Sequence, residues 1–293
     1  MSHRLSTVVI ASSLALCASG CAIWKEAATE PAPLPTPKMS SDSVRLEIGF
    51  LQLAPQDEAV AAQLWSELDE QHLPLALRNR LSANGIRCGL CGTQLPQPLT
   101  DLIEQACCPI SVNDEGESEQ RVDQQSRLSQ RHLHCRAGRR AEIASSQTIP
   151  NMALLTRGAD GVRGKTLTDA QCLLAVKTHP QGDGQVKVEL TPEVHHGQPK
   201  QSWEGQNGVF RQVTSRDREV LADLQLAGTL SPGQTLVLSS TEPSLGLGQH
   251  FFTESDESGQ PARKLLLIRL THTQHDDLFA PERILAPIAT SAE

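Results

Sequence analysis

The stretch VRLEIGFLQL, residues 44–53, decides how the rest of the chain is organised. Every second residue of its first part is apolar, which is the period of a strand with one buried face: Val44, Leu46, Ile48 and Phe50. Pro55 ends this predicted strand. The organisation of the chain depends on which other strand pairs with this one. If it lies in the C-terminal part of the chain, residues 43–271 form one unit.

Helical patterns follow this strand. Residues 57–70 and 74–83 each place apolar side chains on one face, and Asn84-Gly85 is a typical C-terminal stop for a helix. IRCGLCG then reads as a short strand, and residues 98–107 as one more helix. Residues 43–110 are therefore predicted to form a small α/β segment in the order strand, helix, helix, strand.

The remainder of the chain is predicted to be mainly β. Residues 111–127 are acidic, polar and without period, which indicates an exposed linker. Gly, Pro, Asn and Asp then separate short apolar stretches. Candidate strands are residues 131–136, 140–144, 152–156, 172–178, 186–191, 218–226, 235–239 and 264–271. The fold class is α+β, with a mainly antiparallel β domain over residues 128–271 and a flexible tail over 272–293.

The N-terminal residues 1–21 resemble a bacterial lipoprotein signal. A short apolar segment precedes Ala18-Ser19-Gly20-Cys21, a lipobox-like sequence in which the thiol of Cys21 would carry the lipid. The alternative is an ordinary secretory signal. Ala22, rather than aspartate, follows the cysteine, which favours the outer membrane. Residues 22–42 are rich in Pro and Ser and read as a tether to a periplasm-facing domain.

Composition argues against several partners. The chain has 26 basic and 34 acidic residues, a net charge of −8, and both nucleic acid and anionic membranes require basic surface. With no tyrosine, three tryptophans and five phenylalanines, aromatic platforms for sugars or bases are scarce. The membrane contact expected from the sequence is therefore through the N-terminal lipid.

The order of pieces in the C-terminal half is familiar. LLAVKTHPQGDGQVKVELTPEV is followed by a polar loop, then REVLADLQLAGTLSPGQTLVL, GLGQHFF and KLLLIRLTHT. This succession resembles the C-terminal homology domain of bacterial secretins, the outer-membrane channels of secretion and pilus systems. The resemblance implies a secretin-like β fold and a role in an envelope or secretion complex. HHGQPKQSWEGQNGVFRQVTS lacks the alternating apolar face of a barrel strand, so we expect a lipid-anchored module and no pore.

Glycines at three positions in this half are expected to shape the β scaffold: Gly233, Gly246 and Gly248. Pro232-Gly233 reads as the turn into a strand. No helix start is expected after Gly246 and Gly248, which would let the chain turn tightly before Phe251 and Phe252 enter the core. A helix end lined with amides, as a phosphate site requires, is then missing.

ADGVRGKT, residues 159–166, matches a relaxed phosphate loop. Gly164, Lys165 and Thr166 would surround the phosphates and magnesium of a nucleotide. The alternative is a glycine-rich hairpin loop, and the compartment predicted by the signal normally lacks nucleoside triphosphates.

Six cysteines remain after the signal, and they allow several chemistries: Cys88, Cys91, Cys107, Cys108, Cys135 and Cys172. CGLC resembles a redox dithiol or half a zinc site, and His132 and His134 beside Cys135 are also possible zinc ligands. Disulfides are the default in an oxidising compartment, where about 15 pairings of six cysteines exist.

Taken together, the sequence predicts a non-enzymatic, outer-membrane-anchored periplasmic lipoprotein with a structural or assembly role. No catalytic residue and no cofactor are assigned. The alternatives are a metal-binding or redox protein that uses the Cys/His cluster, with zinc as its cofactor, and a nucleotide-binding protein that uses residues 159–166. The residues specify no oligomeric state.

Overall fold

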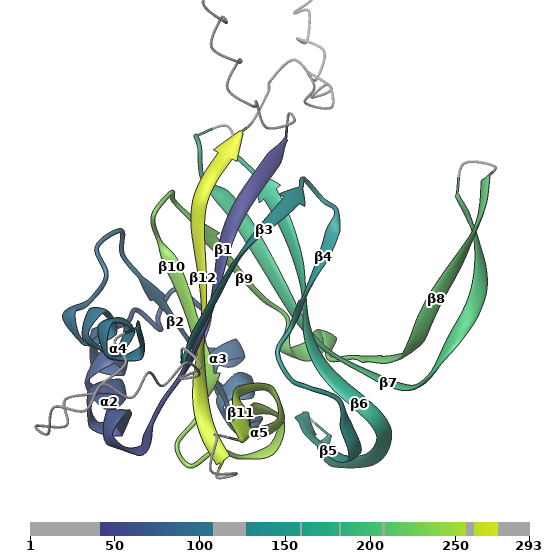
Figure 1. The fold of residues 1–293 in the computed structure, drawn as a ribbon, viewed down its shortest axis with the longest axis horizontal. Helices are drawn as coiled ribbons and strands as arrows, with labels where there is room; N and C mark the ends of the chain where they lie inside the picture. Colours follow the sequence, from purple (N-terminus) through teal and green to yellow (C-terminus); the bar gives the residue numbers. More distant parts are fainter. Residues whose placement is uncertain are drawn as a thin grey trace, which may run out of the picture. The chain divides into compact units, whose positions relative to one another are not determined.

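The computed structural model describes residues 42–107, 127–158, 160–181, 183–206, 209–255 and 261–274. In it, strand β1 (Ser43–Gln52) is paired along both edges (Figure 1). One antiparallel neighbour is β12 (Pro261–Gln274), at the end of the described chain, and the other is β3 (Leu128–Arg136). The partner of the opening strand therefore does lie in the C-terminal part.

Around this pair lies a first sheet in the order β2–β10–β12–β1–β3, with β11 paired to one end of β12. Its remaining strands are β2 (Ile86–Cys91), β10 (Thr235–Ser240) and β11 (Thr253–Ser255). Because β2 and β10 pair along their length, the predicted α/β segment and the predicted β domain share one sheet. The described residues from 42 to 274 accordingly form one compact unit.

A second antiparallel sheet has the order β4–β6–β7–β8, with β5 on β6 and β9 on β7. Its strands are β4 (Arg140–Ala144), β5 (Ile149–Gly158), β6 (Gly161–Pro180), β7 (Val186–Gln206), β8 (Val209–Val220) and β9 (Leu226–Leu230). β6 and β7 are long enough that each pairs with different strands along its two halves. The structure is thus mainly antiparallel β with a few helices, which agrees with the predicted α+β class.

Two apolar clusters hold these layers together. The larger lies between the two sheets and includes Val44, Leu46 and Ile48 of β1, all fully buried. The smaller lies on the opposite face of the first sheet, under α2 (Glu58–Glu67) and α4 (Gln97–Cys107). Each fully buried Leu or Ile side chain stabilises the fold by about 2 kcal/mol, and the alternation seen in residues 44–53 places side chains of β1 in both clusters.

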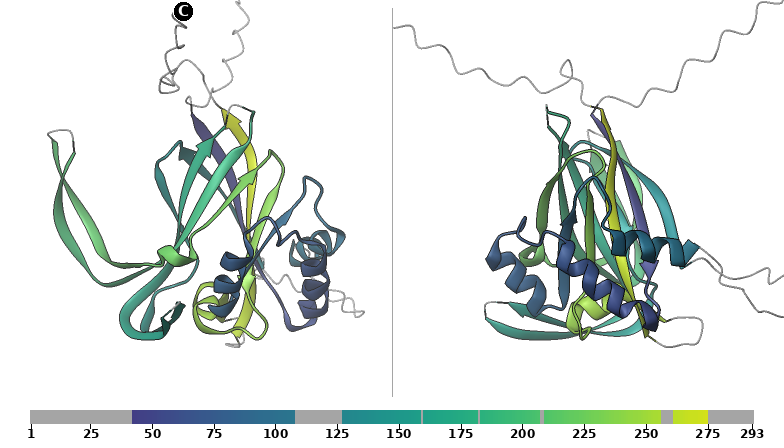
Figure 2. Two further views of the ribbon diagram at one scale, coloured as in Figure 1. Left: turned by 180° about the vertical axis from the view of Figure 1, so that it is seen from behind. Right: turned by 90° about the vertical axis from the view of Figure 1, so that its left-hand side faces the viewer.

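Helices cover the ends of the sheets. α3 (Leu75–Ala83) packs beside β2, and α5 (Gly246–Phe252) lies against β10 and β5 (Figure 2). There are also two short 3-10 helices, η1 (Pro55–Asp57) and η2 (Ala222–Leu224). Within the described residues, no helix has the length and apolar character needed to cross a membrane.

Several predicted segments lie outside the described residues. These are the signal (1–21) with Cys21, nearly all of the tether (22–42), Cys108, nearly all of the linker (111–127) and most of the tail (272–293). The tail begins later than predicted, because β12 continues to Gln274.

Three predictions about the C-terminal half were wrong. Residues 195–206 and 209–217 are not a polar loop: they belong to β7 and β8. A hairpin that stands away from the core has no buried face, so it leaves no period-two signal. Residues 218–226 are not one strand, because η2 separates β8 from β9 and the two lie end to end along one edge of β7.

The third error concerns Gly246, where α5 begins. Leu247 and Phe251 are four residues apart and fully buried, which is helical spacing. Gly233, with φ +90°, does form the expected turn before β10, and Phe251 and Phe252 do enter the core.

Gly248 is required by a close approach between two backbones. Its N–H donates to the carbonyl of Asn84 (3.0 Å), and a Cβ built on Gly248 would lie 1.6 Å from the carbonyl oxygen of Gly85. The side chain of Asn84 fixes the same turn, because its amide exchanges two hydrogen bonds with the backbone of Arg157 (2.8 and 2.9 Å). α3, α5 and β5 therefore meet at this turn.

We predict that Gly248→Ala lowers the free energy of unfolding by about 3 kcal/mol or more, because neither backbone has room to move. Gly92→Ala is the matched control, since its Cβ would have nothing nearer than 3.9 Å, and we expect a change below about 0.5 kcal/mol. Urea unfolding followed by circular dichroism measures both. Equal stability of the two variants would contradict the packing of α5 on the Asn84–Gly85 turn.

Candidate interaction site: the β7–β8 hairpin and its charged base

The outer parts of β7 and β8 project from the body as a two-stranded hairpin (Figures 1 and 2). β7 pairs with β6 from Val186 to His195, and beyond His195 its only described partner is β8. β8 in turn is the last strand of its sheet. Both edges of the projecting hairpin thus carry backbone N–H and C=O groups that no other described strand uses, a geometry that accepts an added strand.

A buried carboxylate lies where the hairpin leaves the body. Glu193 of β7 is only 4% exposed, and its Oε2 accepts a hydrogen bond from Arg140 Nη2 of β4 (2.6 Å). His195 Nε2 lies 3.1 Å from the same oxygen. Burial alone would raise the pKa of Glu193, but the hydrogen bonds from His195 and Arg140 and the charges of Arg140 and Arg218 outweigh it and lower the pKa. An ionised Glu193 therefore ties β4 to the base of the hairpin.

The opposite face of the hairpin base carries a second charged group. Glu219 of β8 pairs with Lys165 of β6, and His196 Nε2 lies 3.7 Å from its Oε1. The hydrogen bond from Lys165 is the largest cause that lowers the pKa of Glu219. Slightly further out, Lys200 Nζ donates to Asp217 Oδ2 (2.6 Å), across a register shift between His196 and Lys200. Such exposed pairs add little stability, but they link β6, β7 and β8 where the hairpin leaves the sheet.

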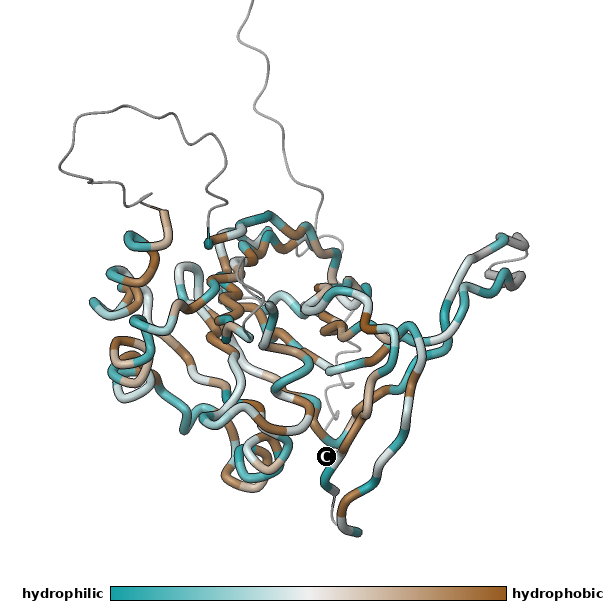
Figure 3. Tube along the Cα trace, turned by 60° about the horizontal axis from the view of Figure 1, so that its bottom comes forward, coloured by the Kyte–Doolittle hydropathy of each residue, from teal (hydrophilic) through white to brown (hydrophobic). Residues whose placement is uncertain are grey.

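The outer part of the hairpin is mostly hydrophilic along its trace (Figure 3). Its strands stay in register from Lys200–Ser215 to Gln206–Val209. One sequence signal for this hairpin exists: Asn207-Gly208, a dipeptide typical of two-residue turns, stands between the two strands. The contact between buried Glu193 and Arg140 was missed, because it joins positions 53 residues apart.

Gly164, Lys165 and Thr166 do not form a phosphate loop. They lie inside β6, opposite Leu155, Leu154 and Ala153 of β5, and β6 continues as a strand to Pro180. A phosphate loop requires backbone amides that converge on one cavity at the start of a helix. Here the residues follow a regular ladder, and Lys165 is paired with Glu219.

The two cysteines of CGLC point to opposite faces of β2. They are three residues apart on a strand, where side chains alternate, so Cys88 lies in the cluster between the sheets and Cys91 in the cluster under α2 and α4. They can neither bond to each other nor bind one metal ion. Burial raises the pKa of both thiols.

The same alternation separates Cys135 from its neighbouring histidines. Cys135 is buried against Thr178, whereas His132 and His134 are exposed on the other face of β3. Cys172 stands six residues before Thr178 on β6, about 20 Å along the strand, so it does not meet Cys135. Burial raises the pKa of Cys135 to about 11 and of Cys172 to about 12.

All five described cysteines are free thiols, and Cys107 is the exposed one. Across the described ranges, no group of three or more His, Cys, Asp or Glu side chains could hold a metal ion.

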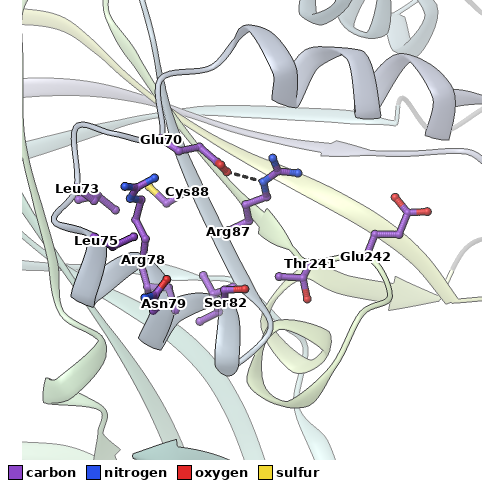
Figure 4. A pocket seen from close by; sticks show the side chains of 12 residues that line it. Glu70, Leu73, Leu75, Arg78, Asn79, Ser82, Arg87, Cys88, Thr241 and Glu242 are labelled. Carbon is purple, nitrogen blue, oxygen red and sulfur yellow. Dashed lines mark hydrogen bonds and ion pairs between the residues drawn. The ribbon is translucent and has the colours of Figure 1, made fainter.

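A pocket of about 580 Å³ lies between α3, β2 and the Thr241–Glu242 turn (Figure 4). Arg87 crosses it to pair with Glu70, and its guanidinium stacks on Trp65, 4.5 Å from the ring centroid. None of the lining residues is a histidine, and the lining thiol, Cys88, has a raised pKa. These side chains include no activated nucleophile, so we assign no reaction to the pocket.

Comparison with protein-family models, with curated proteins and with solved structures found no match for this chain.

We predict that thiol reagents find no fast-reacting cysteine in the folded mature chain once Cys107 and Cys108 are replaced by Ser. Cys88, Cys91, Cys135 and Cys172 are buried and stay protonated at pH 8, because their pKa values are raised. Reaction with Ellman's reagent, before and after denaturation, measures this, with all four reacting only when unfolded. A disulfide among these four, or one equivalent of bound zinc, would contradict the structure.

Proposed function

We propose that the chain is a non-enzymatic, outer-membrane-anchored periplasmic lipoprotein with a structural role in an envelope or secretion complex. It would dock on a partner protein through the β7–β8 hairpin, whose free edges can take up an added strand. The observation that supports this most is the hairpin itself: it projects from the body, and among the described strands its two strands pair only with each other beyond His195.

The chemistry of strand addition suits this hairpin. Backbone hydrogen bonds to an edge supply affinity without a deep pocket. A long free edge is a hazard for aggregation, and proteins normally shorten it, cover it or place charges on it. This hairpin is neither short nor covered by another described strand, so a docking role accounts for it better than a structural role within the body.

The secretin resemblance is proposed as part of the same function. Pairing of β1 with β12 makes the opening strand a neighbour of KLLLIRLTHT, the last element of the resemblance, whereas the elements from Leu173 to Leu230 lie in the second sheet. A chance run of hairpins would not require the opening strand to pair with the closing one. On this proposal, residues 43–271 are one secretin-like unit, held at the membrane by a lipid on Cys21.

Two reciprocal variants test this function. In the first, Asn-Gly replaces residues 201–214 and joins Lys200 to its register partner Ser215 by a two-residue turn. We expect the shortened chain to stay in the membrane fraction, with a Tm within about 4 °C of that of the unsubstituted chain. In intact cells, however, it should no longer form the product in which the chain is cross-linked to its partner protein. In the second, Cys21→Ser, we expect loss of the chain from the membrane fraction after a high-salt wash.

The control shortens the β5–β6 hairpin by the same method, with Asn-Gly between the register partners Arg157 and Val162, which keeps the backbone hydrogen bonds of Arg157 to Asn84. It should keep both the membrane fraction and the cross-linked product. An unchanged cross-linked product in the first variant would show that docking does not use the β7–β8 hairpin. Salt-resistant retention of Cys21→Ser would show that the anchor lies elsewhere.

A further inference from the structure

The outer face of the first sheet is only half covered. α2 and α4 pack on the half that carries Leu51, Leu265 and Leu267. The other half, toward the start of β1 and the end of β12, carries polar and charged residues. Directly opposite residues on antiparallel strands share a face, so the register identifies which ones lie together.

Most of those residues are basic. One row across β3, β1 and β12 is His132, Glu47 and Arg269, and the next is His134, Arg45 and His272. Arg136 of β3 lies opposite Ser43 in the following row. We call this set the basic face, together with Arg139, whose N–H donates to the carbonyl of Arg136 in the turn after β3; Glu47 is its one carboxylate. A chain with net charge −8 thus gathers four arginines and three histidines on one half-face.

The arginines of the basic face have no ion-pair partner within the described chain. Arg136 and Arg139 are exposed, and neither has an ion pair or a side-chain hydrogen bond with another described residue. The Nε of Arg45 is buried and has no hydrogen-bond partner among the described residues. Arg45 and Arg136 are diagonal neighbours on the paired strands β1 and β3. Like charges on neighbouring strands are unfavourable, so an external anion would stabilise this arrangement.

The basic face lies beside the point where the tether begins. Ala137, in the turn between β3 and β4, donates a hydrogen bond from its N–H to the carbonyl of Asp42 (2.8 Å). The residues from 22 to 42 separate this point from Cys21, and an extended chain of that length reaches at most about 70 Å. An anchored chain therefore holds its basic face at high effective concentration near the lipid surface.

We propose that the basic face binds the phosphate-bearing head groups of the membrane leaflet that holds the lipid on Cys21. Naming the membrane as the occupant rests on the lipid anchor of the proposed function. Guanidinium groups match phosphate oxygens in charge and geometry, and a flat sheet face can approach a planar surface with several side chains at once. Each basic residue near an anionic surface strengthens binding by about fivefold.

The test uses the mature chain from residue 22 without lipid, which retains the whole compact unit from Met39. It is mixed with vesicles of phosphatidylethanolamine and phosphatidylglycerol, or of phosphatidylcholine alone, and the bound fraction is measured by co-sedimentation at low salt. We expect binding to anionic vesicles to exceed binding to neutral ones by about tenfold or more, and to fall as salt is raised.

The variant combines Arg136→Gln, Arg139→Gln and Arg269→Gln, and should lose about tenfold or more of the binding to anionic vesicles. The control combines Arg80→Gln, Arg157→Gln and Arg163→Gln, which make the same change in net charge at exposed positions away from the basic face. The control should stay within about twofold of the unsubstituted chain, and replacement of the first three arginines by lysine should retain binding.

Equal binding to the two kinds of vesicle, or equal loss in the two triple variants, would overturn the proposal. A third result would also overturn the proposal. If the chain bound anionic vesicles only after the acidic residues between positions 114 and 123 were neutralised, the ligand of the basic face would be the chain's own acidic segment. The vesicle test omits the lipid and does not involve the hairpin. A negative result in it therefore does not affect the conclusions drawn from fractionation and cross-linking, and negative results in those two experiments do not affect the vesicle test.

Discussion

The antiparallel pairing of β1 with β12 is the constraint on which the rest of this structure depends. It joins residues 43–52 to residues 264–274, almost the full length of the described chain, so closing it costs considerable chain entropy. Burial of Val44, Leu46 and Ile48 on one side, and of Leu51 under α2 and α4 on the other, offsets that cost. β3 and β10 then pair with strands that this closure has already placed, and the two sheets can enclose one core.

Regular alternation and helical spacing made much of this fold predictable. Residues 44–53 alternate because one face is buried, and α2, α3 and α4 were found from their apolar stripes. The hairpin formed by β7 and β8 was missed because a ribbon in solvent needs no apolar face. α5 was missed because Gly246 and Gly248 suggest a turn, whereas Gly248 serves a backbone contact with Gly85 that only the folded chain reveals.

The candidate sites were harder to predict than the fold, again for physical reasons. Spacing along a sequence does not show which face of a strand a side chain takes. Cys88 and Cys91 look like a pair until β2 sends them to opposite clusters, and His132 is separated from Cys135 in the same way. Net charge misleads similarly, because an average of −8 conceals a half-face on which arginine and histidine side chains from three strands meet. The proposed roles use two different surfaces, with the hairpin directed at a protein and the basic face at lipid.

Native-state hydrogen exchange, resolved along the chain, tests the central claim that β1 is an integral strand of one cooperative unit. The account predicts that backbone amides of β1 and β12 exchange as slowly as those in the paired centres of β6 and β7, with opening free energies within about 1 kcal/mol of the global free energy of unfolding. Fast exchange in β1, while β12, β6 and β7 remain protected, would contradict it. The opening strand would then be a peripheral addition, and residues 43–271 would no longer form a single unit.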